Sequence, residues 1–465
     1  MFPPFEPRRV MQIHSCHHRS RGGPRLAACV IALAITAAPS AAQSSASGTS
    51  DAVARTAVQA MLADEVPEEQ VVFPSAVAML DEPEGLFAEP RIVGKAIRFA
   101  TRTIDEGQGS SNGFYPEFSN MATGSGWISV GPGYRQWLFT DRAMVDASTA
   151  VSWRGYKMAQ GRFELTKLAH SRVSAGAQVM WQDATQVTYF GPGPNSADAT
   201  RSEYRLTSTD VVGYATLRPR TWLAIGGRAG WLGRPAIDAP SGTFKRGNPS
   251  ALDLFTGDPA VQRLRQPDFL HTEMSITADT RDSRSHPAHG GVYRGAMETY
   301  ADQGGGAFSF ERYEVEAAHF VGLLGEKVVL AGHGWIVGSA TADGHTIPFY
   351  LTPSLGGHNT LRGYTDYRFH DRNLLLVNGE IRVALIKHLD LAGFVDAGNV
   401  APTFGTLNLA KRDYGVGLRM HTYRATFGRI DLAHGRDGWR LIFRTSDPFQ
   451  LSRLARRVAA LPFAP

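Results

Sequence analysis

The chain has 465 residues, 49 of them glycine, and 43% of its residues are hydrophobic, a composition that favours many short strands over long helices. Five arginines and one glutamate in residues 1–42 carry +4 of the formal net charge of +5, so the rest of the chain is nearly neutral, which excludes a nucleic-acid partner. Both cysteines, Cys16 and Cys29, lie in those first 42 residues, so the chain after them has no thiol for disulfides, thiol catalysis or cysteine metal sites.

The N-terminus predicts export from the cytoplasm. Arg19, Arg21 and Arg25 precede the apolar run LAACVIALAIT (26–36), and small residues follow it up to a cleavage point after Ala42. This pattern is typical of a secretory signal peptide. The apolar run is shorter than the about 20 residues that a membrane-spanning helix needs. We therefore predict a signal peptide at 1–42.

Residues 43–112 do not have the pattern of strands. Apolar residues recur at helical spacing over 50–66 and again over 89–105. No motif in this region carries chemistry. We predict that 43–112 form a periplasmic leader or plug with short helices.

From about residue 113 onward the side chains alternate with a period of two. Over 142–153, for example, Val145 and Trp153 lie on one face of a predicted strand and Asp146 lies on the other. In a soluble sandwich the apolar face would form the core. In a membrane barrel the apolar face contacts lipid and the polar face lines the lumen.

The lengths of the connections separate these two alternatives. Long connections follow the fifth, seventh, eleventh and thirteenth predicted strands, and bacterial outer-membrane barrels have short periplasmic turns and long outer loops. The predicted fold class is therefore all-β, a transmembrane antiparallel β-barrel over 113–449 with a C-terminal tail at 450–465. Its 16 strands, give or take two, are predicted near 113–122, 126–136, 142–153, 156–166, 170–182, 204–217, 221–232, 268–279, 290–302, 309–322, 325–340, 373–386, 389–398, 412–421, 424–433 and 438–446.

A polar and aromatic stretch, GGHNTLRGYTDYRFHD (356–371), interrupts this pattern. It contains the motif LRGY (361–364), and FVDAG (394–398) follows downstream. Together with other short segments these motifs resemble the BamA/TamA superfamily of outer-membrane assembly factors, also called the bacterial surface antigen family. The other segments are DTRDSRSHPAHGG (279–291), NGEIR (378–382) and RIDLA (429–433).

The resemblance implies that the loop between the eleventh and twelfth strands folds into the barrel lumen. An argument from the residues agrees, because Glu380 and Asp396 lie on the polar faces of adjacent strands and would repel each other without a cation between them. Arg362 suits this position, since its planar fork bonds carboxylates in two directions. The alternative leaves Arg362 solvated and both carboxylates in a wet lumen. The predicted lumen-loop lock consists of Leu361, Arg362, Gly363, Tyr364, Glu380, Phe394, Asp396 and Gly398, with Gly363 permitting a backbone bend and Tyr364 packing on the wall.

Residues for catalysis are present but not arranged for it. Ser283, Ser285, His286 and His289 share one short turn that is predicted to face the periplasm, and 15 histidines make chance pairs common. The glycine-rich YFGPGPNS (189–196) lacks the lysine and the strand-to-helix setting of a phosphate loop. We predict no enzyme, and no catalytic, cofactor-binding or metal site.

By resemblance, the function would be protein insertion or translocation at the outer membrane, with lateral opening between the first and last strands. The implied partners are outer-membrane lipid, client outer-membrane proteins and periplasmic chaperones, and the barrel is expected to be a monomer. Residues 43–112 show neither the pattern of the family's periplasmic POTRA modules nor a lipase GxSxG motif, which predicts a barrel-only member. Two alternatives stay open: a transport pore or receptor gated by the lumen loop, and a structural surface protein.

Overall fold

The computed structural model describes residues 85–87, 112–119, 129–242, 247–262, 266–284, 286–305, 307–422, 426–444, 447–449 and 456–463. All of them fall in the second of two units, Met79–Pro465. The predicted signal peptide and almost all of the predicted leader lie outside the described residues. The helices expected at 50–66 and 89–105 therefore stay predictions.

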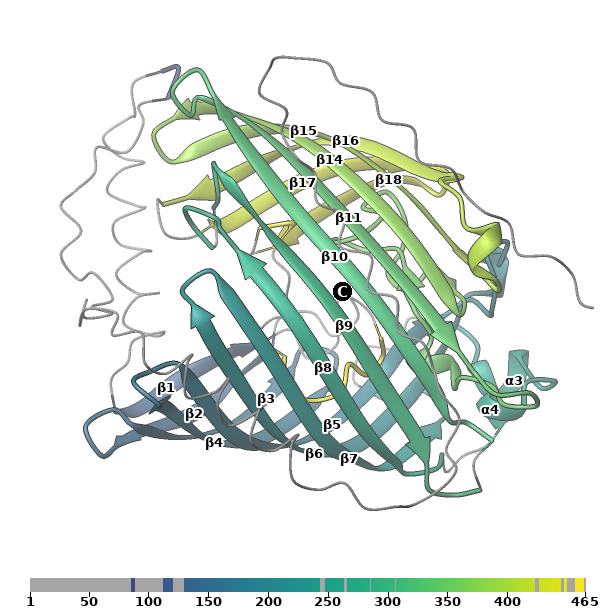
Figure 1. Ribbon diagram of the computed structural model, residues 1–465. Helices are drawn as coiled ribbons and strands as arrows, with labels where there is room; N and C mark the ends of the chain where they lie inside the picture. The colour runs from purple at the N-terminus through teal and green to yellow at the C-terminus, as the bar shows by residue number, and fades with distance from the viewer. Residues whose placement is uncertain are drawn as a thin grey trace, which may run out of the picture. The chain divides into compact units, whose positions relative to one another are not determined.

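Sixteen strands form a single antiparallel sheet, in which each strand pairs with the next one along the chain except that β11 pairs with β14. Figure 1 shows these strands side by side, from β1 through β11 and on to the yellow β18. The predicted all-β barrel fold of about 16 strands is confirmed. The strands are β1 (Gly113–Ser119), β2 (Ser129–Leu138), β3 (Ala143–Ser152), β4 (Lys157–Leu168), β5 (Val173–Tyr189), β6 (Ser202–Arg220), β7 (Leu223–Asp238), β8 (Phe269–Asp279), β9 (Gly290–Asp302), β10 (Phe310–Leu323), β11 (Val328–Ala340), β14 (Asn373–Ile386), β15 (Leu389–Ala401), β16 (Lys411–His421), β17 (Thr426–Gly435) and β18 (Gly438–Arg444).

The remaining elements are short and lie in the connections. A two-residue pair, β12 with β13, lies between β11 and β14. None of the helices in the described part of the chain is long and apolar enough to cross a membrane. These elements are η1 (Asp198–Thr200), α3 (Ala251–Leu254), α4 (Pro259–Gln262), η2 (Phe349–Leu351), β12 (Ser354–Leu355), β13 (Phe369–His370) and η3 (Phe404–Thr406).

The two faces of the sheet have the polarity of a membrane barrel and not of a soluble sandwich. On β10, Val315 is 57% exposed and its neighbour Glu314 only 2%; on β15, Val395 is 61% exposed and Asp396 only 2%. Apolar side chains therefore point outward and charged side chains point inward. Only a closed barrel in lipid satisfies the backbone of such strands and gives the apolar face a favourable neighbour.

The hairpin of β5 and β6 is longer than predicted. β5 continues to Tyr189, past a bulge between Ala184 and Val187, whereas the alternation ends at residue 182. From Gln182 onward every residue of β5 is buried. Because both faces of this outer part are covered, apolar and polar residues no longer alternate there, and the periodicity could not show that the strand continues.

The loop between β11 and β14, residues 341–372, fills part of the interior. Its residues Phe349, Tyr350 and Leu351 join a buried cluster with side chains of β5, β6 and β7. Its residues Leu355 and Leu361 join a second cluster with Trp335 of β11. The predicted inward-folded loop is therefore present, and it packs against strands on both sides of the barrel.

Candidate functional site

The loop reaches the lumen through a tight turn around Leu361. The N–H of Gly357 donates to the carbonyl oxygens of Leu361 and Tyr364, at 3.2 and 3.1 Å. Gly356 and Gly357 both have positive φ, +111° and +112°, which side chains other than glycine rarely tolerate. This turn presents Arg362 to the inner faces of β14 and β15.

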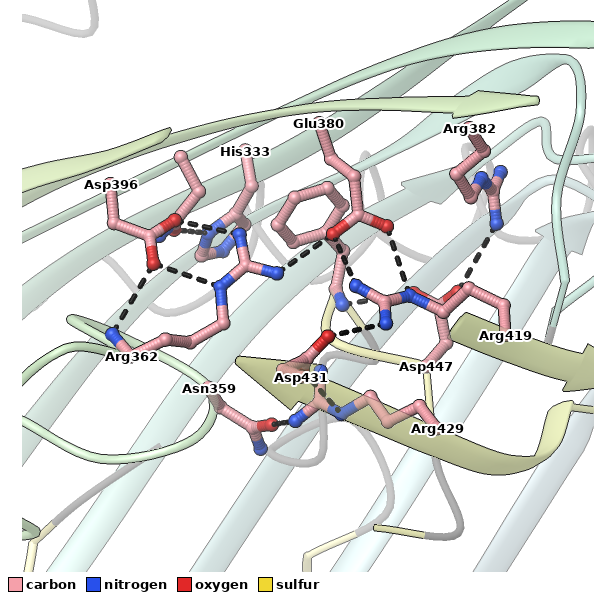
Figure 2. A network of polar contacts seen from close by, with 12 residues as sticks. His333, Asn359, Arg362, Glu380, Arg382, Asp396, Arg419, Arg429, Asp431 and Asp447 are labelled. Atoms are coloured by element: carbon pink, nitrogen blue, oxygen red, sulfur yellow. Dashed lines mark hydrogen bonds and ion pairs between the residues drawn. The ribbon is translucent and has the colours of Figure 1, made fainter. Parts of the chain in front are cut away.

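Arg362 bonds both of the carboxylates that the sequence assigns to it (Figure 2). Its Nε and NH2 donate to the two oxygens of Asp396 at 2.8 and 2.7 Å, and its NH1 donates to Glu380 Oε2 at 2.7 Å. Its backbone N–H also reaches Asp396, at 3.2 Å. Burial on its own would lower the pKa of Arg362, but the Asp396 and Glu380 carboxylates hold that pKa above its usual value.

The ion pairs continue beyond Arg362 across the neighbouring strands. Arg419 of β16 donates to Glu380 at 2.8 Å and pairs with Asp431 of β17 on its other side. Arg429 lies 3.5 Å from Asp431 and donates to the carbonyl oxygen of His358 in the loop at 2.7 Å. The series therefore starts and ends at the loop.

We call this series the charge chain: Asp396, Arg362, Glu380, Arg419, Asp431 and Arg429. All six side chains are at most 1% exposed. Three arginines face three carboxylates, so the charges balance. Buried charges are stable only when paired in this way, because desolvation of each ion costs several kcal/mol.

The other predicted lock residues pack around Arg362. Its guanidinium carbon lies 3.5 Å from the centre of the Phe394 ring, close enough for a cation–π contact. Leu361 is fully buried, and Tyr364 donates from its hydroxyl to the carbonyl oxygen of Arg412 at 3.3 Å. All three side chains therefore fix the position of the loop on the wall.

The two lock glycines allow close backbone approaches. A Cβ on Gly363 would lie 2.6 Å from the Cβ of Asp413 and 2.7 Å from the nitrogen of Gly435 on β17. A Cβ on Gly398 would lie 2.6 Å from the carbonyl oxygen of Leu375. Gly363 lies in a turn closed by the Tyr364 N–H, which donates to the Leu361 carbonyl oxygen at 3.0 Å. Its φ is not in the left-handed region, so the close contact, and not a positive φ, requires glycine at this bend.

Sequence reasoning missed Arg419, Arg429 and Asp431, although RIDLA contains two of them. Alternation places Arg429 and Asp431 on the same face of one strand, which was a usable signal. The register, however, sets Arg419 directly opposite Arg429. Two arginines opposite each other predict repulsion, and only the full three-dimensional chain of carboxylates shows why both are tolerated.

Asn378 and His333 extend the network on the other side of Arg362. Asn378 Nδ2 donates to Asp396 Oδ1 and to the carbonyl oxygen of Thr360, both at 2.8 Å. His333 contacts Asn378 Oδ1 at 2.7 Å and Glu316 Oε1 at 3.0 Å. The network thus extends along the inner wall from β10 to β17.

His358 makes the loop sensitive to acid. It is buried beside Arg444 and Arg429 and near Asp366, and burial lowers its pKa to about 4. Because this value is below that of the unfolded chain, about 6.5, the stabilisation is present above pH 6.5 and is lost as pH falls toward 4. Full protonation would cost on the order of 3 kcal/mol.

We therefore expect the thermal unfolding temperature to decrease when the pH is lowered from 7.5 to 4.5. The decrease should be smaller in His358→Gln than in the wild type. His289→Gln is the matched control, since the His289 side chain is 50% exposed. Equal pH dependence of the three proteins would contradict the assigned role of His358.

One cluster of the described residues has the composition of a metal site. Ligand atoms of His286, Asp390 and His421 lie within 4.8 Å of one another. Each histidine Nε2 is 3.1 Å from an oxygen of Asp390, and the two rings stack with centroids 3.6 Å apart. Burial lowers the pKa of His286 to about 3, so it is neutral.

Hydrogen bonds occupy the atoms of this cluster that face one another, although Nδ1 of His421 has no partner among the described residues. A metal on Nε2 of His286 would move the proton to Nδ1, which faces NH1 of Arg382 at 3.3 Å, and two donors would then oppose each other. We expect purified protein dialysed against zinc to retain less than stoichiometric metal by elemental analysis. Retention of one zinc per chain by the wild type, and its loss in His421→Ala, would show that the cluster is a metal site.

The prediction that the protein is not an enzyme stays a prediction.

Fold and site together define a class: a β-barrel of the bacterial outer membrane whose lumen holds an inward loop fixed by buried ion pairs. Residues 245–435, which include this loop and the whole charge chain, match the Omp85 superfamily domain. This part of the chain therefore carries the Omp85 superfamily domain, and the predicted resemblance to the BamA/TamA superfamily is confirmed.

Among solved structures, one barrel shares this fold with a TM-score above 0.5, and two others align with lower scores. BamA from Haemophilus ducreyi lacking POTRA domains 1–3 aligns with a TM-score of 0.53 at 12% identity, over 76% of this chain and 77% of that one. CdiB from Acinetobacter baumannii aligns at 0.43 and 13% identity, over 71% and 58% of the two chains. CdiB from Escherichia coli aligns at 0.45 and 10%, over 71% and 61%. The comparison with curated proteins gave no match.

Proposed function

We propose that this barrel inserts or translocates polypeptide clients at the outer membrane, through an opening between β1 and β18. The observation that carries the proposal is the Omp85 superfamily domain over residues 245–435, because that domain holds the loop motif and the carboxylates that bind it. Outer-membrane proteins are the proposed clients, and periplasmic chaperones the proposed carriers.

The ends of the sheet support this opening. β1 and β18 are the two ends of the strand order, and each has only seven residues, whereas β6 has nineteen. A barrel closed between two short strands has few hydrogen bonds to break at that seam. The seam would therefore open more readily than any other strand pair.

The outer surface beside β1 is also suited to an apolar client. An open hollow there is lined by Phe114 and, on the following strands, by small residues such as Gly133, Ala147 and Gly161, with Val179 and Trp181 at its edge. Because these side chains are small, the apolar outer face next to the seam is hollowed. A client strand leaving the barrel would meet this surface first.

The test is the folding rate of a small outer-membrane protein in liposomes with and without this barrel. We expect faster insertion with the barrel, and loss of that acceleration when a disulfide joins β1 to β18. Trial cysteine pairs combine Phe114 or Pro116 of β1 with Leu441 or Phe443 of β18, whose side chains are all exposed, in a chain lacking Cys16 and Cys29, and reduction restores the rate in the same sample.

Insertion that is no faster with the barrel would contradict the proposal. Large, steady conductance of the purified barrel in a planar bilayer, combined with that result, would favour a transport pore. If the cross-linked protein still accelerates insertion, the proposed opening between β1 and β18 is contradicted, whereas the proposed insertion activity is not.

A further inference from the structure

The C-terminal residues RRVAALPF (456–463) are bound inside the barrel. Chain ends usually fray unless they are tied down, yet Val458, Ala459, Leu461 and Phe463 are all buried. Ala459 and Leu461 join one of the two hydrophobic clusters that contain lumen-loop residues, and Phe463 joins the other. The segment therefore occupies a defined site on the inner wall.

The first half of this segment is held by its main chain. Arg228 NH1 of β7 donates to the carbonyl oxygens of Arg457 and Val458, both at 3.0 Å. Asp210 Oδ2 of β6 accepts from the N–H of Ala459 at 2.5 Å. These contacts do not depend on the side chains of the bound residues.

The second half is held in the same way by β5 and the loop. Gln182 Nε2 donates to the carbonyl oxygen of Leu461 at 3.2 Å. Ser354 Oγ donates to the carbonyl oxygen of Phe463 at 2.8 Å, and the N–H of Phe463 donates to the carbonyl oxygen of Tyr350 at 3.0 Å. Six main-chain hydrogen bonds thus fix eight residues.

One side chain of the segment has a pocket of its own. The guanidinium carbon of Arg312 lies 3.9 Å from the centre of the Phe463 ring. The indole of Trp335 stacks on the same ring at 6.0 Å. An aromatic ring between a cation and an indole gains packing and cation–π energy together, so this position selects an aromatic residue.

The binding groups are fixed without the segment. Arg228 pairs with Glu273 and Glu298 at 2.8 and 3.0 Å, and Arg312 pairs with Glu298 at 3.3 Å. His271 likewise contacts Asp210, at 2.9 Å. The wall therefore keeps its charges paired and its geometry organised when the segment leaves.

We propose that the inner wall of β5, β6 and β7, with the 341–372 loop and the aromatic pocket on β10 and β11, is a binding site for an extended polypeptide segment carrying an aromatic residue, and that residues 456–463 are its resident occupant. This inference rests on the proposed function, since a client segment that enters the lumen would displace the resident one. It names the class of client segment: extended, read by its main chain, with an aromatic anchor.

The direct test uses a chain that ends at Ala455 and a fluorescent peptide of sequence RRVAALPF. Fluorescence anisotropy in detergent measures the binding of the peptide to the protein. We expect the shortened protein to bind the peptide about tenfold or more tightly than the full chain, where the tethered segment competes at high effective concentration. Circular dichroism and heat-dependent gel mobility establish that the shortened barrel is folded. A folded shortened barrel that does not bind the peptide would overturn the inference.

Two modified peptides test how the segment is recognised. N-methylation at Ala459 removes the N–H that Asp210 accepts and should weaken binding, whereas N-methylation at Ala460, outside the six contacts above, is the matched control. A peptide with Phe463→Ala should also bind more weakly. Equal affinity of all the peptides would contradict main-chain recognition with an aromatic anchor.

A second measurement uses the full chain, without the native cysteines, and does not depend on truncation. Ala460→Cys should react slowly with a water-soluble maleimide and faster when excess peptide is added, whereas Ala342→Cys, at an exposed position, should react quickly throughout. Equal rates at both positions would overturn the inference. Because neither assay involves client insertion, a barrel that binds peptide but does not insert clients would contradict the proposed function alone.

Discussion

Arg362→Ala is expected to lower the free energy of unfolding by about 3 to 5 kcal/mol, the cost of leaving a buried charge without its partner. The substitution removes three hydrogen bonds to Asp396 and Glu380 and leaves three buried carboxylates facing two arginines. Equilibrium urea unfolding in detergent, followed by tryptophan fluorescence, measures this loss.

Two variants make that result specific. Arg362→Lys keeps the charge but loses the planar fork, so it should fall between the wild type and Arg362→Ala. Arg284→Ala removes an arginine whose side chain is 81% exposed, and exposed ion pairs contribute only about 0 to 1 kcal/mol. An effect of Arg362→Ala no larger than that of Arg284→Ala would contradict the assigned role of Arg362.

The double variant Arg362→Met with Asp396→Leu is expected to recover at least about half of the stability lost by either change alone. Replacing both partners of a buried ion pair by apolar residues is often close to neutral. The four residues left, Glu380 with Arg419 and Asp431 with Arg429, again balance two charges against two. The four unfolding free energies form a double-mutant cycle.

A related pair controls for simple repacking. Arg362→Met with Glu380→Leu also removes one charge of each sign, but it breaks the charge chain at Arg419. Without Glu380, Arg419 and Arg429 would share a single carboxylate, Asp431. This pair should recover less of the lost free energy of unfolding than Arg362→Met with Asp396→Leu. Equal recovery by both pairs would mean that the order of charges along the chain does not matter.

The sequence predicts the barrel and the first link of the charge chain well, for one physical reason. Alternation fixes which face of a strand each side chain occupies, so Glu380 and Asp396 could be placed inside and Arg362 assigned to them. The rest of the charge chain could not be predicted, because Arg419 and Arg429 lie directly opposite each other. Only the folded structure shows that the carboxylates of Glu380 and Asp431 pair with these two arginines.

The C-terminal region shows the same limit. β18 spans Gly438–Arg444, close to the strand predicted at 438–446, and Phe449 lies against Phe320 and His333. The segment RRVAALPF has no period that predicts a strand or helix, because its main chain is bound by other elements. Binding of this kind leaves no pattern in the bound sequence.

Trypsin digestion of the folded barrel in detergent, where both ends of the barrel are accessible to the protease, tests whether the 341–372 loop is fixed inside the lumen. Trypsin cuts after arginine, and Arg362 and Arg368 in the loop are both buried. We predict no cleavage at either residue in the wild type under conditions that cut at the exposed Arg284, and cleavage at Arg368 in Arg362→Ala. Cleavage at Arg362 or Arg368 in the wild type as fast as at Arg284 would contradict the account.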